Sequence, residues 1–358
     1  MKEAMTHKER FMAAVNHKEG DRVPLCMDAE ADVWPKLSKA LGVKNKEACY
    51  KALEIDEWML DPHVTDPRRK TLSEDESVSQ WGYHVCRKET EFGYYHDICK
   101  PPIKGEELTL EEIDNHDWPD FSLIDFDHYD QKMAEMGNRA YISHITHGPY
   151  FNCTFIRGME NFLMDIAMNP ELAKRMMDRA ELYIQGAIDN LLNNARPLPD
   201  VYYIADDFCS SGGPLFSPIT WREWVKPYLT RIGEKVHAKG VKFMIHVCGS
   251  VRPYIPDLIE AGVDILEPVQ TTAVGMSLQG LKKDFGNDIT FYGSIDTHHV
   301  LPKGTKQEVE DAVKRTIDIM APGGGFILGP AHTYIQPDTP IENIITMYRT
   351  AAEYGRYK

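Results

Sequence analysis

A histidine and a cysteine two residues apart, His246 and Cys248, close the apolar run at residues 241–247. In a β-strand, residues i and i+2 project to the same side, so these two side chains can reach one ion together. A neutral imidazole and a thiolate are ligands that suit Zn²⁺. The pair therefore indicates a metal site, with a packed cysteine beside a hydrogen-bonded histidine as the alternative.

Two further ligand-type residues, Glu267 and His332, follow other short apolar runs. The ends of parallel strands meet at one rim when the strands close into a barrel. Catalytic zinc commonly keeps three protein ligands and one open position. We expect His246, Cys248 and His332 as metal ligands. Glu267 is then a displaceable fourth ligand, a partner that orients an imidazole, or a salt-bridged carboxylate of the rim.

Paired carboxylates, Asp206 and Asp207, follow the apolar run 201–205. Such a pair can orient a histidine, hold a substrate hydroxyl or share a proton, while a helix cap is the structural alternative. We take both, with Glu267, as candidate catalytic residues. Ring-bearing residues near these positions could line a substrate pocket, although such residues often pack in a core. The candidates for substrate binding are Tyr202, Phe208, His147 and Tyr292.

The elements that must position these residues alternate along the chain. Seven short apolar runs at residues 22–28, 139–147, 201–205, 241–247, 265–269, 289–292 and 325–329 are separated largely by helical patterns. Alternation of this kind predicts βα units and a parallel sheet. A doubly wound sheet is disfavoured because no glycine-rich loop follows the first run.

We therefore expect an α/β fold, a (β/α)₈ TIM barrel with an N-terminal helical extension. Residues 1–358 would form one domain, with an irregular insertion at about 61–120 that contains hairpin strands near 81–87 and 91–97. Residues 34–60 are expected to form one or two short helices.

Charge and composition exclude several functions. The 40 basic and 55 acidic residues give a net charge of −15, which disfavours sequence-independent binding of nucleic acid. No run of about 18 apolar residues predicts a membrane span. The seven cysteines are an odd number without a C-x-x-C pair, which argues against a disulfide scaffold. We expect a cytoplasmic protein in a reducing compartment, with Cys248 as a zinc thiolate and the other six cysteines mostly packing or incidental.

The chain resembles the uroporphyrinogen decarboxylase superfamily over nearly its whole length. The opening segment His7–Pro24 is similar to the first helix and strand of the superfamily. More specific are the motifs Ala205-Asp-Asp-Phe208, His246-Val-Cys-Gly249, Tyr292-Gly-Ser-Ile-Asp296 and Pro330-Ala-His332. The resemblance implies the same barrel.

Within that superfamily, the chain looks like the cobalamin-dependent methyltransferases. Decarboxylases of the superfamily grip a polycarboxylate with a basic segment, whereas the segment after Pro24 is acidic here, with Asp28, Glu30 and Asp32. The methyltransferases that act on coenzyme M carry an H-x-C pair and a later cysteine as zinc ligands. His332 stands in place of that cysteine, and an imidazole makes the zinc a stronger Lewis acid than a thiolate does.

These features predict the methyl-donor component of a corrinoid-dependent O-demethylase. Its cofactors would be Zn²⁺ and a cobalamin carried by a corrinoid protein, and its donor would be a small aromatic methoxylated molecule. Nucleic acid and membrane partners are not expected. The alternatives are a decarboxylase of the uroporphyrinogen type, a methylcobalamin:thiol methyltransferase, and a scaffold subunit with a structural zinc.

Overall fold

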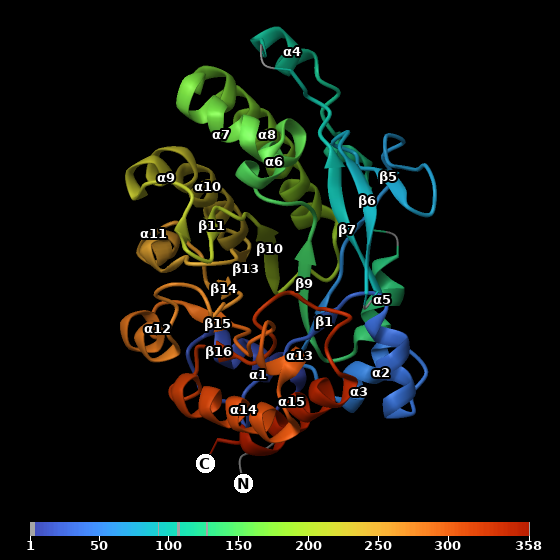
Figure 1. Cartoon of the computed structure of the whole chain (residues 1–358), viewed down its shortest axis with the longest axis vertical. Coiled ribbons are helices and arrows are strands. Elements are labelled where there is room, and N and C mark those ends of the chain that lie inside the picture. The colour runs from blue at the N-terminus through green and yellow to red at the C-terminus, as the bar shows by residue number, and fades with distance from the viewer. Residues whose placement is uncertain (1–3, 92, 106–107, 127, 358) are drawn as a thin grey trace.

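The computed structural model describes residues 4–91, 93–105, 108–126 and 128–357. A curved parallel sheet forms its centre (Figure 1), in the strand order β16-β15-β14-β13-β10-β9-β2. The strands are β2 (Glu57–Met59), β9 (Ala140–His144), β10 (Val201–Ala205), β13 (Lys242–His246), β14 (Ile265–Glu267), β15 (Thr290–Tyr292) and β16 (Phe326–Ile327). The α/β barrel expected from the alternating pattern is confirmed.

The stretch 22–27 closes the barrel between its two end strands. Cys26 N–H donates to Leu328 O at 2.9 Å, and Leu328 N–H donates to Pro24 O at 2.9 Å. On the other side, Asp56 N–H donates to Leu25 O at 2.9 Å. The stretch therefore takes the place of the eighth strand of the barrel. It continues into β1 (Asp28–Ala29), which pairs in parallel with β17 (Tyr334–Ile335).

One barrel strand differs from the sequence prediction. Residues 34–60 contain α2 (Val33–Leu41) and α3 (Lys46–Ala52), as expected, but they also contain β2. This strand carries Glu57, which is buried, directly after the buried Asp56. Two adjacent acidic residues do not resemble a barrel strand, because buried carboxylates are rare unless they are paired.

Helix α1 (His7–Val15) closes the N-terminal end of the barrel. Thr6 caps it with a full capping box to Glu9. Its residues Phe11, Ala14 and Val15 pack in one buried cluster with inward-facing strand residues such as Ile142 and Met244. The N-terminal helical extension is thus a plug rather than an appendage.

Arginine side chains tie this plug to the sheet. Arg10 Nη1 donates to Asp56 Oδ1 at 2.6 Å, and Arg22 Nη1 donates to Asp56 Oδ2 at 2.7 Å. Asp56 is fully buried and also accepts the Leu25 N–H at 2.7 Å. Burial alone would raise the pKa of Asp56. Hydrogen bonding to His7 and the charges of the two arginines outweigh burial and hold the pKa below its ordinary value.

The insertion near residues 61–120 forms a small antiparallel sheet beside the barrel (Figure 1). Its strands are β4 (Lys70–Thr71), β5 (Glu76–Val78), β6 (His84–Thr90) and β7 (Gly93–Lys100), followed by α4 (Leu110–Asn115). A second pair joins β3 (His63–Val64) to β8 (Ile124–Asp125), and η1 (Phe121–Leu123) precedes β8. The predicted hairpin is present, with its strands shifted by a few residues toward the C-terminus.

The cysteine prediction requires a correction in this sheet. Cys86 on β6 and Cys99 on β7 form a disulfide, with Cα atoms 5.8 Å apart. The other five cysteines are free. The pair was not predicted from the sequence because its members lie 13 positions apart, and only the hairpin brings them together.

Helices cover the outside of the barrel (Figure 1), and no described helix is long and apolar enough to cross a membrane. Helices occupy most of the segments between the barrel strands, as the alternating pattern predicts. The remaining elements are α5 (Tyr129–Met136), α6 (Pro149–Arg157), α7 (Met159–Met168), α8 (Pro170–Asn194), β11 (Cys209–Ser210), β12 (Gly213–Pro214), α9 (Pro218–Trp224), α10 (Lys226–His237), η2 (Arg252–Tyr254), α11 (Ile255–Glu260), α12 (Leu278–Phe285), α13 (Val300–Lys303), α14 (Lys306–Met320) and α15 (Ile341–Tyr354).

Candidate metal and substrate site

Strand alternation aims three polar side chains into the barrel at its C-terminal end. Tyr203, His246 and Glu267 lie at even spacing from the inward residues Val201, Met244 and Ile265 of their own strands. The register of β13 on β14 pairs His246 with Glu267. Neighbouring strands therefore deliver these two side chains to one point.

Glu267 fixes the orientation of the His246 ring. Its Oε2 lies 2.5 Å from His246 Nδ1, and it accepts the Tyr203 hydroxyl at 3.2 Å. Thr333 donates its hydroxyl to Glu267 Oε1 at 2.9 Å, and the same hydroxyl lies 3.0 Å from His246 Nδ1. An ionised carboxylate can only accept, so Nδ1 carries a proton and Nε2 is left for another partner.

Cys248 and Asp207 lie on the Nε2 side of the same ring. Cys248 Sγ is 3.3 Å from His246 Nε2, and Asp207 Oδ1 is 3.7 Å from it. Asp207 Oδ1 also accepts the Cys248 N–H at 2.7 Å. One ligand-type atom from each of the three residues lies within 4.8 Å of the others. A nitrogen, a sulfur and an oxygen donor around one point fit a zinc-type ion.

Gly249 lets the chain turn directly after Cys248. Its φ is +92°, and a Cβ there would lie 2.5 Å from Ser210 O. A side chain is therefore excluded both by backbone conformation and by space. The Gly249 N–H donates to Gln270 Oε1 at 2.8 Å, which holds the turn in place.

The neighbouring acidic groups all raise the pKa of His246. Burial would lower the pKa of His246, but the charges of Glu267, Cys248 and Asp207 raise it well above its ordinary value. Burial would raise the pKa of Glu267, and the neighbouring His246 lowers it instead. A ring held among anions attracts positive charge to Nε2, in the form of either a proton or a metal ion.

His332 and Tyr292 lie beside this cluster. The ring centroids of His332 and His246 are 6.0 Å apart at nearly right angles. His332 Nδ1 lies 3.2 Å from the Tyr334 N–H, so its Nε2 is the atom left for a ligand. Tyr292 is mostly buried and lines a small cavity together with Glu267, His332 and Thr333.

Three expected site residues lie elsewhere. Asp206 is fully buried and accepts the Phe151 N–H at 2.7 Å, so it caps the N-terminus of α6. Its burial raises its pKa to about 8. Tyr202 points away from the barrel interior and is fully buried in the main core. Phe208 is fully buried and packs edge-on against Trp221 and Tyr254. Tyr202 and Phe208 therefore pack in the core rather than in the cleft, and Asp206 contacts α6 rather than the His246 ring.

Two residues of the cluster were not among the sequence candidates. Tyr203 is the inward neighbour of Tyr202, and counting alternate residues back from the end of β10 would have selected it. Thr333 follows His332 directly, but nothing in its type or spacing marked it as a partner of Glu267.

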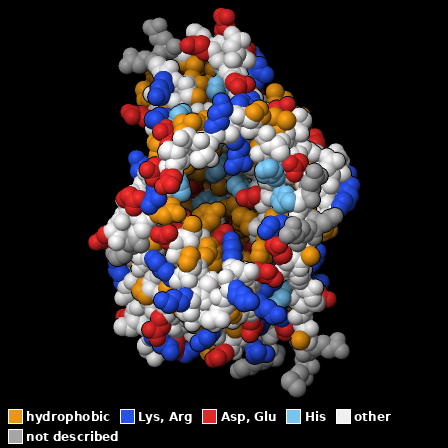
Figure 2. Space-filling view, turned by 90° about the vertical axis from the view of Figure 1, so that its right-hand side faces the viewer, with side chains coloured by type: hydrophobic (Ala, Val, Ile, Leu, Met, Phe, Trp, Pro, Cys, Tyr) orange, Lys and Arg blue, Asp and Glu red, His pale blue; other side chains and the backbone are white. Residues whose placement is uncertain are grey.

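A cleft of about 430 Å³ lies between the β4–β7 sheet and the barrel. His144 and His147 line it from the barrel side, and Trp81 and Tyr83 from the insertion. Burial, followed by the charges of His144 and His246, lowers the pKa of His147 to about 3, so its ring is neutral. Figure 2 shows a hollow on the corresponding side of the molecule, with hydrophobic side chains in its floor and histidines around it.

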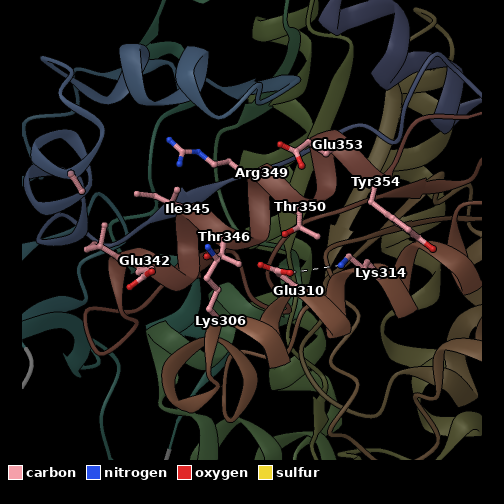
Figure 3. A pocket seen from close by; sticks show the side chains of 12 residues that line it. Lys306, Glu310, Lys314, Glu342, Ile345, Thr346, Arg349, Thr350, Glu353 and Tyr354 are labelled. Atoms are coloured by element: carbon pink, nitrogen blue, oxygen red, sulfur yellow. Dashed lines mark ion pairs between the residues drawn. The ribbon is translucent and has the colours of Figure 1, made fainter.

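A second hollow, of about 650 Å³, has a different character. Figure 3 shows it between α14 and α15, where Lys306, Glu310, Lys314 and Arg349 line it. Lys314 pairs with Glu310 at 3.7 Å. These side chains belong to the outer helical layer, and none of the residues that line this hollow is a histidine or cysteine. It therefore offers no ligands for the chemistry of the rim.

Comparison with known sequences points to one family. Residues 106–354 match the family described as uroporphyrinogen decarboxylase (URO-D). A methylated-thiol–coenzyme M methyltransferase of Methanosarcina mazei is 25% identical over 264 residues, which are 71% of this chain and 65% of that protein. A methylcobamide:CoM methyltransferase MtaA of Methanosarcina barkeri is 30% identical over 159 residues, 43% of this chain and 42% of that protein. The matches thus span about two fifths to two thirds of these relatives.

A solved structure shares the fold over the whole chain. It is described as a methyltransferase from Methanosarcina mazei, with a TM-score of 0.67 and 17% sequence identity. The match covers 98% of this chain and 99% of the other. Identity this low supports the shared architecture, while function must be argued from the site.

Proposed function

The chain belongs to the uroporphyrinogen decarboxylase family, and from this premise we propose that it is a methyltransferase that moves a methyl group from a small donor to a corrinoid on a partner protein. One observation carries the proposal, namely the nitrogen, sulfur and oxygen donors of His246, Cys248 and Asp207 gathered around one point. Relatives whose names state methyl transfer to coenzyme M support the same class of reaction.

We assign the three ligands of the metal to His246 Nε2, Cys248 Sγ and Asp207 Oδ1. Glu267 takes the role of the partner that orients the imidazole, because it occupies the Nδ1 side. His332 faces the same ring and is placed to contact the donor or the fourth ligand position. Zn²⁺, when bound, supplies a Lewis acid that draws charge from the heteroatom of the methyl donor.

We place the donor in the cleft lined by His144 and His147, because the His144 ring lies 5.2 Å from the ring of Tyr203, which belongs to the cluster. The rings of Trp81, Tyr83 and His147 line the cleft and favour a flat apolar molecule. A neutral His147 adds a hydrogen-bonding group without a charge. For this reason, we propose a methoxylated arene as the donor.

In the proposed reaction, the methyl carbon leaves the ether oxygen and bonds to cobalt. Cob(I)alamin provides both electrons of the new cobalt–carbon bond. The ether oxygen keeps the electrons of the broken bond and takes up a proton from solvent. The products are a phenol and methylcob(III)alamin. A site with one thiolate and one carboxylate suits an oxygen leaving group better than a site with two thiolates, because a carboxylate oxygen donates less electron density to the metal than a thiolate sulfur does.

The direct test is methyl transfer to free cob(I)alamin, followed by its absorbance, with methoxyarenes, methanol, methylamines and methylthiols as donors. We expect turnover with a methoxyarene, and loss of turnover in the Cys248→Ala variant with the melting temperature unchanged. Methylation of a thiol from methylcobalamin, without any demethylation of arenes, would establish the thiol methyltransferase instead.

Two alternatives have their own tests. A decarboxylase would release carboxylate groups from a porphyrinogen even with a chelator present. The acidic Asp28, which begins strand β1, and Glu30, which follows that strand, disfavour such a polyanionic substrate. A scaffold with structural zinc would lose its fold, rather than only its activity, when His246 is replaced by Ala.

A further inference from the structure

Three ligand-type side chains gather on one face of the β4–β7 sheet, away from the rim site, and a fourth, His84, contacts one of them. Glu76 on β5 pairs directly with Cys86 on β6, so their side chains share a face. His84 lies two residues before Cys86 and therefore points the same way. Its Nδ1 lies 2.6 Å from Glu76 Oε1.

A register shift brings Cys99 to the same place. Between β6 and β7, Val85 pairs with Ile98 and His84 pairs with Lys100, so Cys99 is an extra residue in the ladder. A bulge of this kind re-aims a side chain. Ligand atoms of Glu76, Cys86 and Cys99 all lie within 4.8 Å of one another.

A disulfide staple explains only part of this arrangement. A disulfide requires only Cys86 and Cys99. It does not account for the Glu76 carboxylate beside the two sulfur atoms or for the His84 imidazole that contacts this carboxylate. Two thiolates, one imidazole and one carboxylate are a complete four-ligand set for a zinc-type ion. Both cysteines are only half-buried, so a reductant can reach them.

We propose that the reduced β6–β7 hairpin binds one zinc-type ion through Cys86, Cys99, Glu76 and His84, and that the disulfide is the oxidised, metal-free form of this site. A dithiol reductant supplies the two electrons and two protons that convert the disulfide to two thiols, and it becomes a disulfide itself; metal binding then releases the thiol protons. Lys100, whose Nζ lies 2.5 Å from Glu76 Oε1, gives up that oxygen to the ion. Its long, half-exposed side chain can move.

The position of the site indicates that the ion would stabilise one wall of the cleft. Tyr83 and Val85, which alternate with His84 and Cys86, line the cleft between this sheet and the barrel. An ion bound on the opposite face of the sheet would connect β5, β6 and β7 and therefore hold this wall of the cleft in place. This inference does not depend on which reaction the cleft serves.

Metal analysis of the full chain tests the proposal. A phosphine reductant opens the disulfide, taking one oxygen from water as it becomes the phosphine oxide. Zn²⁺ is then added and the excess removed by gel filtration under anaerobic conditions. We expect the reduced protein to hold one more equivalent of zinc than the oxidised protein. The His246→Ala/Cys248→Ala variant, which lacks the rim site, should keep that difference.

Matched variants locate the additional ion. Cys86→Ser/Cys99→Ser should abolish the difference between reduced and oxidised protein, and Glu76→Gln should weaken binding at least tenfold. Glu89→Gln, on the same strand and paired with Arg87, should change neither. With Co²⁺ as the probe in the His246→Ala/Cys248→Ala background, where the rim site supplies no thiolate, thiolate-to-metal absorption should vanish when Cys86 and Cys99 are also replaced by serine.

Equal zinc content in reduced and oxidised protein would overturn the inference, as would an additional equivalent that survives the loss of both cysteines. Circular dichroism of each variant identifies any loss of metal that follows from unfolding. Should the cysteine variant fail to fold, the reduced-minus-oxidised comparison on the unaltered chain still decides the question.

Discussion

At the scale of single residues, the two nitrogen atoms of His246 divide the site into two halves. Glu267, Thr333 and Tyr203 occupy the Nδ1 side, and Cys248 and Asp207 the Nε2 side. The residues on the Nδ1 side fix the orientation and the tautomer of the His246 ring, and those on the Nε2 side can bind a metal ion. The role of Glu267 therefore differs from that of Cys248, although both lie close to the same imidazole.

Replacing Glu267 by Gln should weaken zinc binding by about 10–100-fold, because the carboxylate that orients the imidazole and raises its basicity is lost. Competitive titration against a chelating dye measures the affinity. Glu260→Gln removes an exposed carboxylate that pairs with Lys226, and it serves as the control that should bind zinc normally. Unchanged affinity in Glu267→Gln would show that Glu267 does not support the metal.

The third ligand can be assigned by comparing two variants. Asp207→Asn should lose zinc affinity by at least tenfold, because its oxygen lies among the donors on the Nε2 side. His332→Ala should keep most of the affinity and lose methyl transfer. The reverse pattern would make His332 the ligand, as the sequence alone suggests.

The sequence predicted the central pair of the site but not all of its surroundings. His246 and Cys248 follow from type and spacing. Tyr203 could have been chosen over Tyr202, since alternation fixes which of two neighbours faces the barrel. Asp206 and Asp207 could not be separated, because only the position of α6 decides which of them becomes a cap.

At the scale of elements, the plug α1 depends on a buried carboxylate. Asp56 accepts hydrogen bonds from Arg10, from Arg22 and from the Leu25 N–H. It therefore links helix α1, the stretch 22–27 and strand β2. Removing it leaves two largely buried guanidinium groups without their common partner. The element is therefore held by charge as much as by the packing of Phe11.

Asp56→Ala should destabilise the fold by about 3–5 kcal/mol, the cost of breaking a buried ion pair from one side. Denaturant unfolding measures the change. Glu54→Gln is the matched control, because Glu54 pairs with the same Arg22 but is about half exposed. It should change the free energy of unfolding by less than about 0.5 kcal/mol. Similar effects in both variants would contradict the special role of Asp56.

Asp21 makes the attachment of α1 sensitive to acid. Although burial would raise its pKa, hydrogen bonds and the charge of Arg10 lower it to about 2, from 3.8 in an unfolded chain. A lowered carboxyl pKa stabilises the fold above the unfolded value, and this stabilisation is lost as pH falls toward the folded value.

Asp21→Asn should therefore cost about 1–2 kcal/mol at pH 7, and this cost should shrink between about pH 4 and pH 2. Urea unfolding of both proteins across this range measures the difference. A constant difference down to pH 2 would show that the charge of Asp21 is not responsible.

The elements themselves were largely predictable, and their exceptions share a cause. Long periodic helices such as α8 and α14 follow from their patterns and caps. Strand β2 was missed because Asp56 and Glu57 look exposed, and the sequence does not reveal the arginines that neutralise Asp56. The Cys86–Cys99 pair depends on a register shift in the hairpin, which spacing does not reveal.

At the scale of the whole molecule, a closed barrel carries a second, smaller sheet beside its polar rim. The barrel holds the metal-type residues rigidly on strand ends, and the sheet adds the other wall of the cleft. The proposed reaction needs both, because the donor must lie between the ligands on one side and the corrinoid on the other.

The plug α1 closes the N-terminal end of the barrel to both reactants of the proposed reaction. Because α1 fills the bottom of the barrel with Phe11, Ala14 and Val15, the proposed donor and the proposed corrinoid protein would both approach the rim from the opposite, C-terminal end. The corrinoid protein would cover the mouth of the barrel at that end while it is bound. Binding would then follow a compulsory order, with the small molecule first and the phenol trapped until the partner leaves. High concentrations of corrinoid protein should slow turnover, because the bound partner would block the mouth of the barrel. Initial rates measured at increasing partner concentration would reveal this inhibition.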